Sequence, residues 1–137
     1  MEYIFRADGT IKVDAFTMSY IETALWSTPV LTEDGSGDAG TLDDHFGPED
    51  IPLAILQEMI RDCEDFQRSE RHALHFSGLS PEQAGANFWL TRERHGAGFW
   101  DHGQERIWKH LTDAAHAYGS PGDVLMCAMP PVEKEED

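Results

Sequence analysis

Positive charge is scarce in this sequence of 137 residues, which has 10 Lys and Arg against 26 Asp and Glu and a formal net charge of -16. Such a charge disfavours phosphate backbones and anionic membranes, and it favours solubility or a basic partner. No apolar run approaches the roughly 20 residues of a membrane span. The N-terminus has no basic region followed by an apolar one, so we expect no signal peptide and a cytoplasmic protein.

Cysteine and recognised catalytic motifs are also scarce. Cys63 and Cys127 are far apart and lack metal-ligand spacing, which predicts two reduced thiols. There is no GxSxG, Walker, HExxH or paired CxxC pattern. An EF-hand loop starting at Asp34 would need Gly and Glu where the sequence has Ala39 and His45. We therefore predict no catalytic residue, no metal and no cofactor.

The apolar pattern predicts one small α+β domain over residues 1–129. Two short apolar runs flank Asp8-Gly9, which is a strong hairpin signal. Residues 16–27 have apolar side chains at helical spacing, although their β-branched and aromatic content leaves a strand as the alternative. Residues 32–47 form an acidic loop because glycine and aspartate leave little there to bury.

Three further helices are predicted. Apolar residues at three- and four-residue steps indicate a long helix over residues 50–75, with a break at residues 67–71 as the alternative. Ser80-Pro81-Glu82-Gln83 is a capping box that predicts a short helix over residues 81–87. The last helix is expected over residues 104–118. Residues 130–137 are predicted to be a disordered acidic tail.

The densest chemical signal is FWLTRERHGAGFWDHG at residues 88–103. We predict a hairpin here, with residues 88–92 as one strand, a glycine-bearing turn, and residues 99–101 as the returning strand. Residues 123–129 are a predicted final strand. The expected fold is a small mixed or antiparallel sheet packed against two or three helices. The sheet comprises the N-terminal hairpin, the Phe88–Asp101 hairpin and the C-terminal strand.

Two surfaces are candidates for binding. Residues 33–65 contain eleven of the 26 acids and one base, Arg61. The first surface is the acidic face of this stretch, and its candidate partner-binding residues are Asp34, Asp38, Asp43, Asp44, Glu49, Asp50, Glu58, Asp62, Glu64 and Asp65. The second surface is the aromatic and basic hairpin, whose side chains suit stacking on bases and contacts with phosphate. Its candidate ligand residues are Trp89, Arg92, Arg94, His95, Trp100, Asp101 and His102.

Each surface has a plain alternative. The hairpin residues can be structural, with one face in the core and the other under a helix. A small enzyme or metal protein built on His95, Asp101 and His102 is a third hypothesis. Abundant acids are also common in soluble proteins that bind no basic partner.

Residues 88–119 resemble a group of small proteins encoded by tailed bacteriophages and prophages. The shared motif comprises FWLTR at residues 88–92, HGAGFWD at residues 95–101, and a helix with Leu-Thr and Ala-Ala that ends in Tyr118-Gly119. Residues 20–26 and 82–85 also fit. This chain departs from the pattern at Asn87, where Asp is common, and at Glu93-Arg94, where Asn-Gly is common. The resemblance implies a phage context and no particular activity.

Charge and phage context together suggest a stoichiometric inhibitor of host defence or DNA-processing machinery. In this anti-CRISPR-like hypothesis, the acidic face mimics a nucleic acid and docks on a basic host protein in the cytoplasm of the host bacterium. The alternative is a nucleic-acid or nucleotide-binding protein that uses the Phe88–His102 hairpin. Both hypotheses leave the oligomeric state open.

Overall fold

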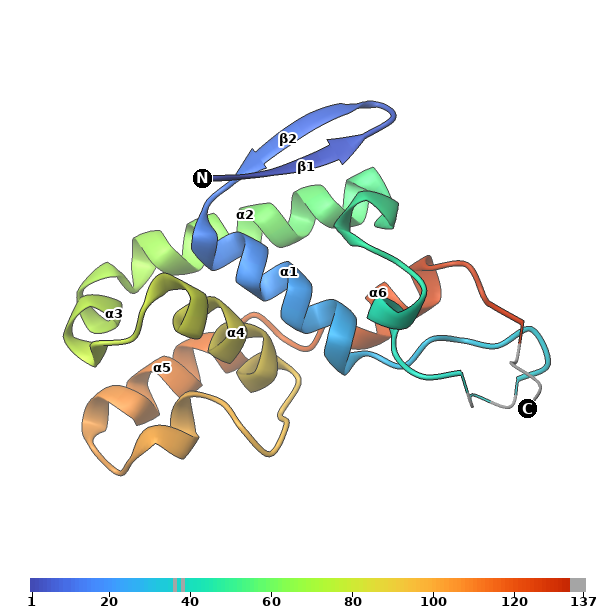
Figure 1. The fold of residues 1–137 in the computed structure, drawn as a ribbon. Helices are drawn as coiled ribbons and strands as arrows, with labels where there is room; N and C mark the ends of the chain where they lie inside the picture. Colours follow the sequence, from blue (N-terminus) through green and yellow to red (C-terminus); the bar gives the residue numbers. More distant parts are fainter. Residues whose placement is uncertain (36, 38, 134–137) are drawn as a thin grey trace.

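The computed structural model describes residues 1–35, 37 and 39–133, and it shows several helices packed together with one β-hairpin above them (Figure 1). The predicted α+β class is confirmed. In chain order the elements are β1 (Glu2–Arg6), β2 (Gly9–Val13), α1 (Ala15–Ser27), η1 (Leu42–Asp44), η2 (Pro48–Asp50), α2 (Leu53–Ser69), α3 (Arg71–Ser77), α4 (Pro81–Arg92), η3 (Phe99–His102), α5 (Arg106–His116) and α6 (Gly122–Ala128).

The N-terminal hairpin is confirmed. Strands β1 and β2 pair in antiparallel register, with Ile4 opposite Ile11 and Arg6 opposite Gly9. The two-residue turn is therefore one position earlier than Asp8-Gly9, and Gly9 begins β2 with a φ of 127°. Arg6 Nη1 donates hydrogen bonds to the carbonyls of Glu49 and Ile51 at 3.1 and 2.6 Å. These bonds hold the hairpin against η2 and the start of α2.

The predicted Phe88–Asp101 hairpin is wrong, because FWLTR forms the second half of α4. The Ser80 capping box starts this helix as expected, with Ser80 Oγ accepting from the backbone N–H of Gln83 at 3.1 Å, but the helix continues to Arg92. Its buried residues include Ala84, Phe88 and Arg92, each four positions apart, which places them on one face against α1. Packing on that face outweighs the strand preference of the aromatic residues.

The other two predicted strands are also helical. Residues 99–101 lie in η3, and residues 123–129 form α6 with Met129 at its end. Short apolar runs occur in buried strands and buried helices alike, so periodicity alone does not distinguish them. In the described residues, the sheet therefore consists of β1 and β2 alone.

The remaining helices follow the prediction closely. Residues 15–27 are helical, and the cap of α1 is Asp14, whose Oδ1 accepts from the backbone N–H of Thr17 at 2.8 Å. The long predicted helix is broken at Glu70 into α2 and α3, within the expected interval. Gly78 ends α3 in the left-handed conformation, with a φ of 75°.

Helices α1 and α4 pack most closely at the centre of the fold. A Cβ atom placed on Gly85 would lie 2.1 Å from the carbonyl oxygen of Phe16, so only glycine allows this approach. Around the contact, Phe88 stacks on Phe66 of α2 with ring centroids 4.0 Å apart, and Tyr20 meets Trp89 edge-on. These aromatic rings form the middle of the hydrophobic core.

The loop after α1 and the C-terminal segment lie side by side at one end of the molecule (Figure 1). Within the loop, Leu42 N–H donates to the carbonyl of Thr28 at 2.9 Å. Val132 N–H donates to Leu31, and Glu33 N–H donates back to Val132, each at 2.9 Å. The predicted disordered tail therefore includes an ordered residue, Val132, and its last four positions, 134–137, lie outside the described residues.

Candidate acidic binding surface and an adjoining cavity

Acidic residues from two distant parts of the sequence gather at one end of the fold. We define the acidic end as residues 28–50 and 121–133, which meet through the Leu31–Val132 and Glu33–Val132 hydrogen bonds. Neither segment contains a Lys or Arg. Arg6 of β1 touches this end through the carbonyl of Glu49, but its charge is paired with Asp8. The described acids of this end are Glu33, Asp34, Asp43, Asp44, Glu49, Asp50, Asp123 and Glu133. Asp38, also predicted to bind a partner, lies outside the described residues.

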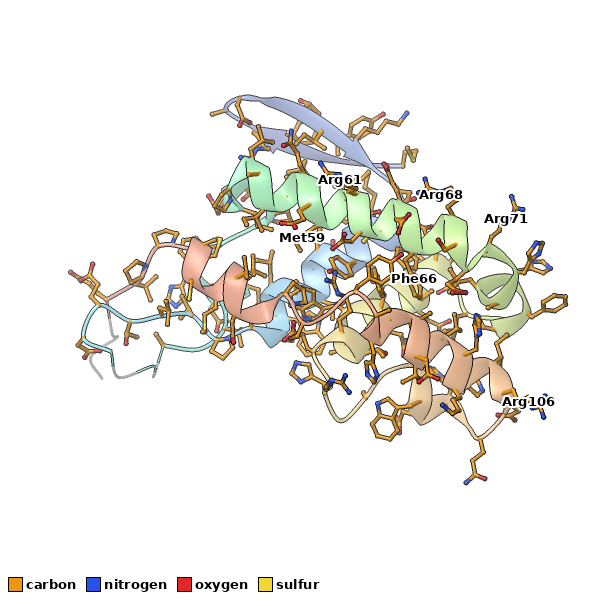
Figure 2. The ribbon with its side chains drawn as sticks, turned by 180° about the vertical axis from the view of Figure 1, so that it is seen from behind. Met59, Arg61, Phe66, Arg68, Arg71 and Arg106 are labelled. Carbon is orange, nitrogen blue, oxygen red and sulfur yellow. The ribbon has the colours of Figure 1, made fainter. Side chains whose placement is uncertain are left out.

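The opposite end has a balanced charge. Figure 2 shows Arg68, Arg71 and Arg106 at the end of the molecule away from α6. Acids lie beside the bases there: Arg68 pairs with Asp65 at 2.6 Å, and Lys109 of α5 pairs with Asp113 at 2.8 Å. The net charge of -16 is therefore unevenly distributed, and the acidic end carries a large share of it.

Two acids of the acidic end have a structural role. Asp44 Oδ2 accepts from the backbone N–H of Thr41 at 3.0 Å, and Asp50 Oδ2 accepts from that of Gly47 at 2.9 Å. Each carboxylate caps a short 3-10 helix, since the first N–H groups of a helix have no partner within it. All eight described acids of this end are exposed, and Asp43 accepts a hydrogen bond from the hydroxyl of Thr41. Glu33, Asp43, Glu49 and Asp123 can be neutralised without removing the capping bonds of Asp44 and Asp50, so these four acids are the ones to test.

The predicted acids of α2 lie on different sides of the helix. Glu58 and Asp62 are four residues apart and share one side, where both line a cavity. Glu64 lies about 120° around the helix from Glu58, on the outer side. Asp65 accepts a hydrogen bond from the hydroxyl of Tyr118 at 2.6 Å, and this bond is the main cause of the lowered pKa of Asp65. Of these four acids, Glu58 and Glu64 are exposed.

The predicted aromatic and basic surface is split between the core and the exterior. Trp89 is 1% exposed, and its indole N–H donates to Ser27 Oγ at 2.8 Å. Arg92 is 5% exposed. The remaining residues of this set, Arg94, His95, Trp100, Asp101 and His102, are exposed on the turn after α4 and on η3.

Two of these exposed residues have contacts that explain their positions. His102 stacks on Trp108 with ring centroids 4.7 Å apart, and its Nε2 is 3.0 Å from Asn87 Oδ1. Arg94 adopts a positive φ of 55°, which closes the turn after α4. Among the described residues, the structure records no interaction that joins His95, Asp101 and His102. In the same part of the chain, no group of three or more His, Cys, Asp or Glu side chains is placed to hold a metal ion.

Arg92 is the centre of a buried polar cluster that sequence reasoning missed. Its Nη1 donates to the hydroxyl of Tyr20 at 2.7 Å and to Asp62 Oδ2 at 2.9 Å. Its Nε and Nη2 donate to the carbonyls of Gly119 and Tyr118 at 2.9 and 2.8 Å. Burial raises the pKa of Tyr20 far above its usual range, so this hydroxyl stays protonated. The guanidinium thus joins α1, α2, α4 and the segment before α6.

A cavity of about 270 Å³ lies between α2 and α6, beside the Arg92 cluster. Its apolar walls include Ile55 and Met59 from α2 and Val124 from α6. Figure 2 shows Met59 between these two helices. Sequence reasoning named Glu58 and Asp62 as surface acids, but the tertiary structure places both beside a cavity formed by residues about 60 positions away. No local sequence signal indicates this arrangement.

The thiols differ in environment. Cys63 is buried among the apolar residues of α2, and burial raises the pKa of its thiol well above the usual value. Cys127 is exposed on α6.

In the described part of the chain, no helix is both long and apolar enough to cross a membrane. Comparison of the sequence and structure with protein-family models, curated proteins and solved structures gives no match.

Proposed function

We propose that the protein binds a basic protein through its acidic end and acts as a stoichiometric inhibitor by covering a surface that otherwise binds nucleic acid. The supporting observation is the segregation of charge, with eight described acids and no Lys or Arg in the two segments that form this end. Opposite potentials steer two proteins together and fix the orientation of docking. The phage resemblance makes host defence and DNA-processing proteins the first candidates for the partner.

The acidic end is more favourable for this role than the segment around Phe88. Stacking on nucleic-acid bases requires exposed aromatic side chains near cations. Trp89 and Arg92 are both buried, which leaves Trp100 as the exposed aromatic residue of the predicted set. A chain with a net charge of -16 also repels a phosphate backbone over most of its surface.

The test uses two variants with the same net charge. The acidic-end variant carries Glu33→Gln, Asp43→Asn, Glu49→Gln and Asp123→Asn, and it spares the capping acids Asp44 and Asp50. The control variant carries Glu2→Gln, Glu22→Gln, Glu82→Gln and Glu105→Gln, at exposed acids outside the acidic end. Each variant removes four negative charges and changes the net charge from -16 to -12.

Tagged wild-type and variant proteins would be used to capture partners from lysate of the host bacterium, with and without nuclease treatment, at low and moderate salt. We expect the wild type and the control to retain one basic protein and release it as salt screens the contact. Four lost surface contacts of about 0.2–1 kcal/mol each predict that the acidic-end variant binds roughly 4- to 700-fold more weakly. After the captured protein is purified and loaded with nucleic acid, it should release that nucleic acid when the wild type is added.

Two results would contradict the proposal. Equal capture by the acidic-end variant and the control would show that the position of the charge does not matter. Recovery of nucleic acid alone, lost after nuclease treatment, would instead favour a nucleic-acid-binding protein.

A further inference from the structure

We propose that the cavity between α2 and α6 receives the side chain of an Arg or Lys from the basic partner. This inference rests on the proposed function and deepens it by naming the chemical group at the centre of the contact. Glu58 and Asp62 line the cavity with Arg92, so its formal charge sums to minus one when these three groups are ionised. A cation is therefore favoured there over an anion.

The guanidinium of Arg92 does not make the cavity a site for an anion. Its donors already bind Asp62, the Tyr20 hydroxyl and the carbonyls of Tyr118 and Gly119. Asp62 and the two carbonyls thus hold Arg92 in place. Glu58 is exposed at the cavity and is the carboxylate that an incoming ammonium or guanidinium group can reach.

The size and walls of the cavity suit one long side chain. Its volume of about 270 Å³ is just below the roughly 300–1,000 Å³ of typical small-molecule sites. Ile55, Met59 and Val124 offer apolar contact to an aliphatic stem, and Tyr118 offers an aromatic ring. Val124 is 56% exposed, which is high for an apolar side chain at the rim of a cavity.

The location of the cavity connects it to the acidic end. Val124 belongs to α6, whose residues are part of the acidic end, and Pro121 and Leu125 of the same segment also line the cavity. A partner that docks on the acidic end would therefore pass its surface over the cavity mouth. Protein interfaces commonly place one Arg in a pocket at their centre, surrounded by weaker polar contacts.

The test titrates the full-length protein with N-acetyl-arginine amide and with N-acetyl-citrulline amide, a neutral molecule of nearly the same shape. Amide and indole NMR signals report the site, since Trp89 and Gly119 line the cavity. We expect the arginine compound to shift these signals and the citrulline compound to leave them in place. Glu58→Gln should weaken binding about fivefold, whereas the control Glu64→Gln, on the outer side of the same helix, should not change it.

Three results would overturn the inference. The two compounds could shift the signals equally, neither compound could shift them, or Glu58→Gln could leave binding of the arginine compound unchanged. The capture experiment distinguishes a failure of the cavity inference from a failure of the proposed function. If Glu58→Gln captures the partner as well as wild type, the acidic-end proposal stands and the side chain is not in the cavity. If the arginine compound binds but no basic protein is captured, the partner side chain is rejected and the cavity is assigned to a free amine or guanidine.

Discussion

The sharpest prediction concerns the change in stability caused by Gly85→Ala. Helix propensity predicts that this substitution stabilises the fold, whereas the packing of α1 on α4 predicts that it destabilises the fold. In the interior of a helix, replacing glycine with alanine is worth about 1 kcal/mol of stabilisation. In this fold, however, the new Cβ would lie 2.1 Å from the Phe16 carbonyl oxygen and 2.9 Å from its carbon. A carbon normally lies at about 3.3 Å or more from a carbonyl oxygen, so α1 and α4 would have to separate by about 1 Å.

The size of the effect follows from what surrounds this contact. The obstructing atoms belong to the backbone of α1 and cannot rotate away, so we place the overpacking cost at about 3 kcal/mol, the upper part of the usual range. Subtracting the propensity gain leaves a net loss of about 2 kcal/mol. For a domain of this length, such a loss lowers Tm by roughly 6–10 °C.

The measurement is thermal unfolding of wild type and Gly85→Ala, followed by circular dichroism, with urea unfolding to obtain the free energy. Ala86→Gly is the matched control in the same helix, and propensity alone predicts that it loses about 1 kcal/mol. If Gly85→Ala unfolds at the same or a higher temperature than wild type, the close approach of α1 and α4 is incorrect.

Two further predictions concern buried or partly buried polar groups. Arg92→Met should lower the free energy of unfolding by about 3 kcal/mol, because it leaves the Asp62 carboxylate without its partner, and adding Asp62→Leu should recover part of that loss. Asp14→Ala should cost about 1 kcal/mol at pH 7 by removing the cap of α1, while Asp14→Asn, which can still accept from the N–H of Thr17, should cost less. Urea unfolding measures all of these free energies.

The Asp14 effect should depend on pH in a defined direction. Burial opposes ionisation of Asp14, but hydrogen bonds from Thr17 and Gln67 outweigh it, and the pKa of Asp14 is lowered in the folded protein. Its contribution is therefore fully present above the unfolded pKa of about 3.9 and is lost as pH falls through the lower folded value. A difference between wild type and Asp14→Ala that grows on acidification would contradict this assignment.

The Arg92 prediction has its own control in the double variant. Additive losses for Arg92→Met and Asp62→Leu would mean that the two charges do not interact, whatever their distance. We expect instead a clear coupling, since the two groups are 2.9 Å apart and Arg92 is buried.

The sequence alone determined the features that depend on a few neighbouring residues. The turn beside Gly9 and the capping box at Ser80 both act through local backbone geometry, and each was predicted at or next to its place. Net charge is likewise independent of the fold. These features could be identified because the free energy that favours each one comes from residues within a few positions of it.

The tertiary structure decided whatever depends on distant partners. Phe88–Arg92 is helical because its apolar face packs on α1 and α2, although the same residues in isolation suit a strand. The Leu31 and Val132 segments join two acidic stretches about 100 positions apart, and Arg92 meets Tyr20 and Asp62 from two other helices. Long-range packing and hydrogen bonding supply these free energies, and no local pattern in the sequence records them.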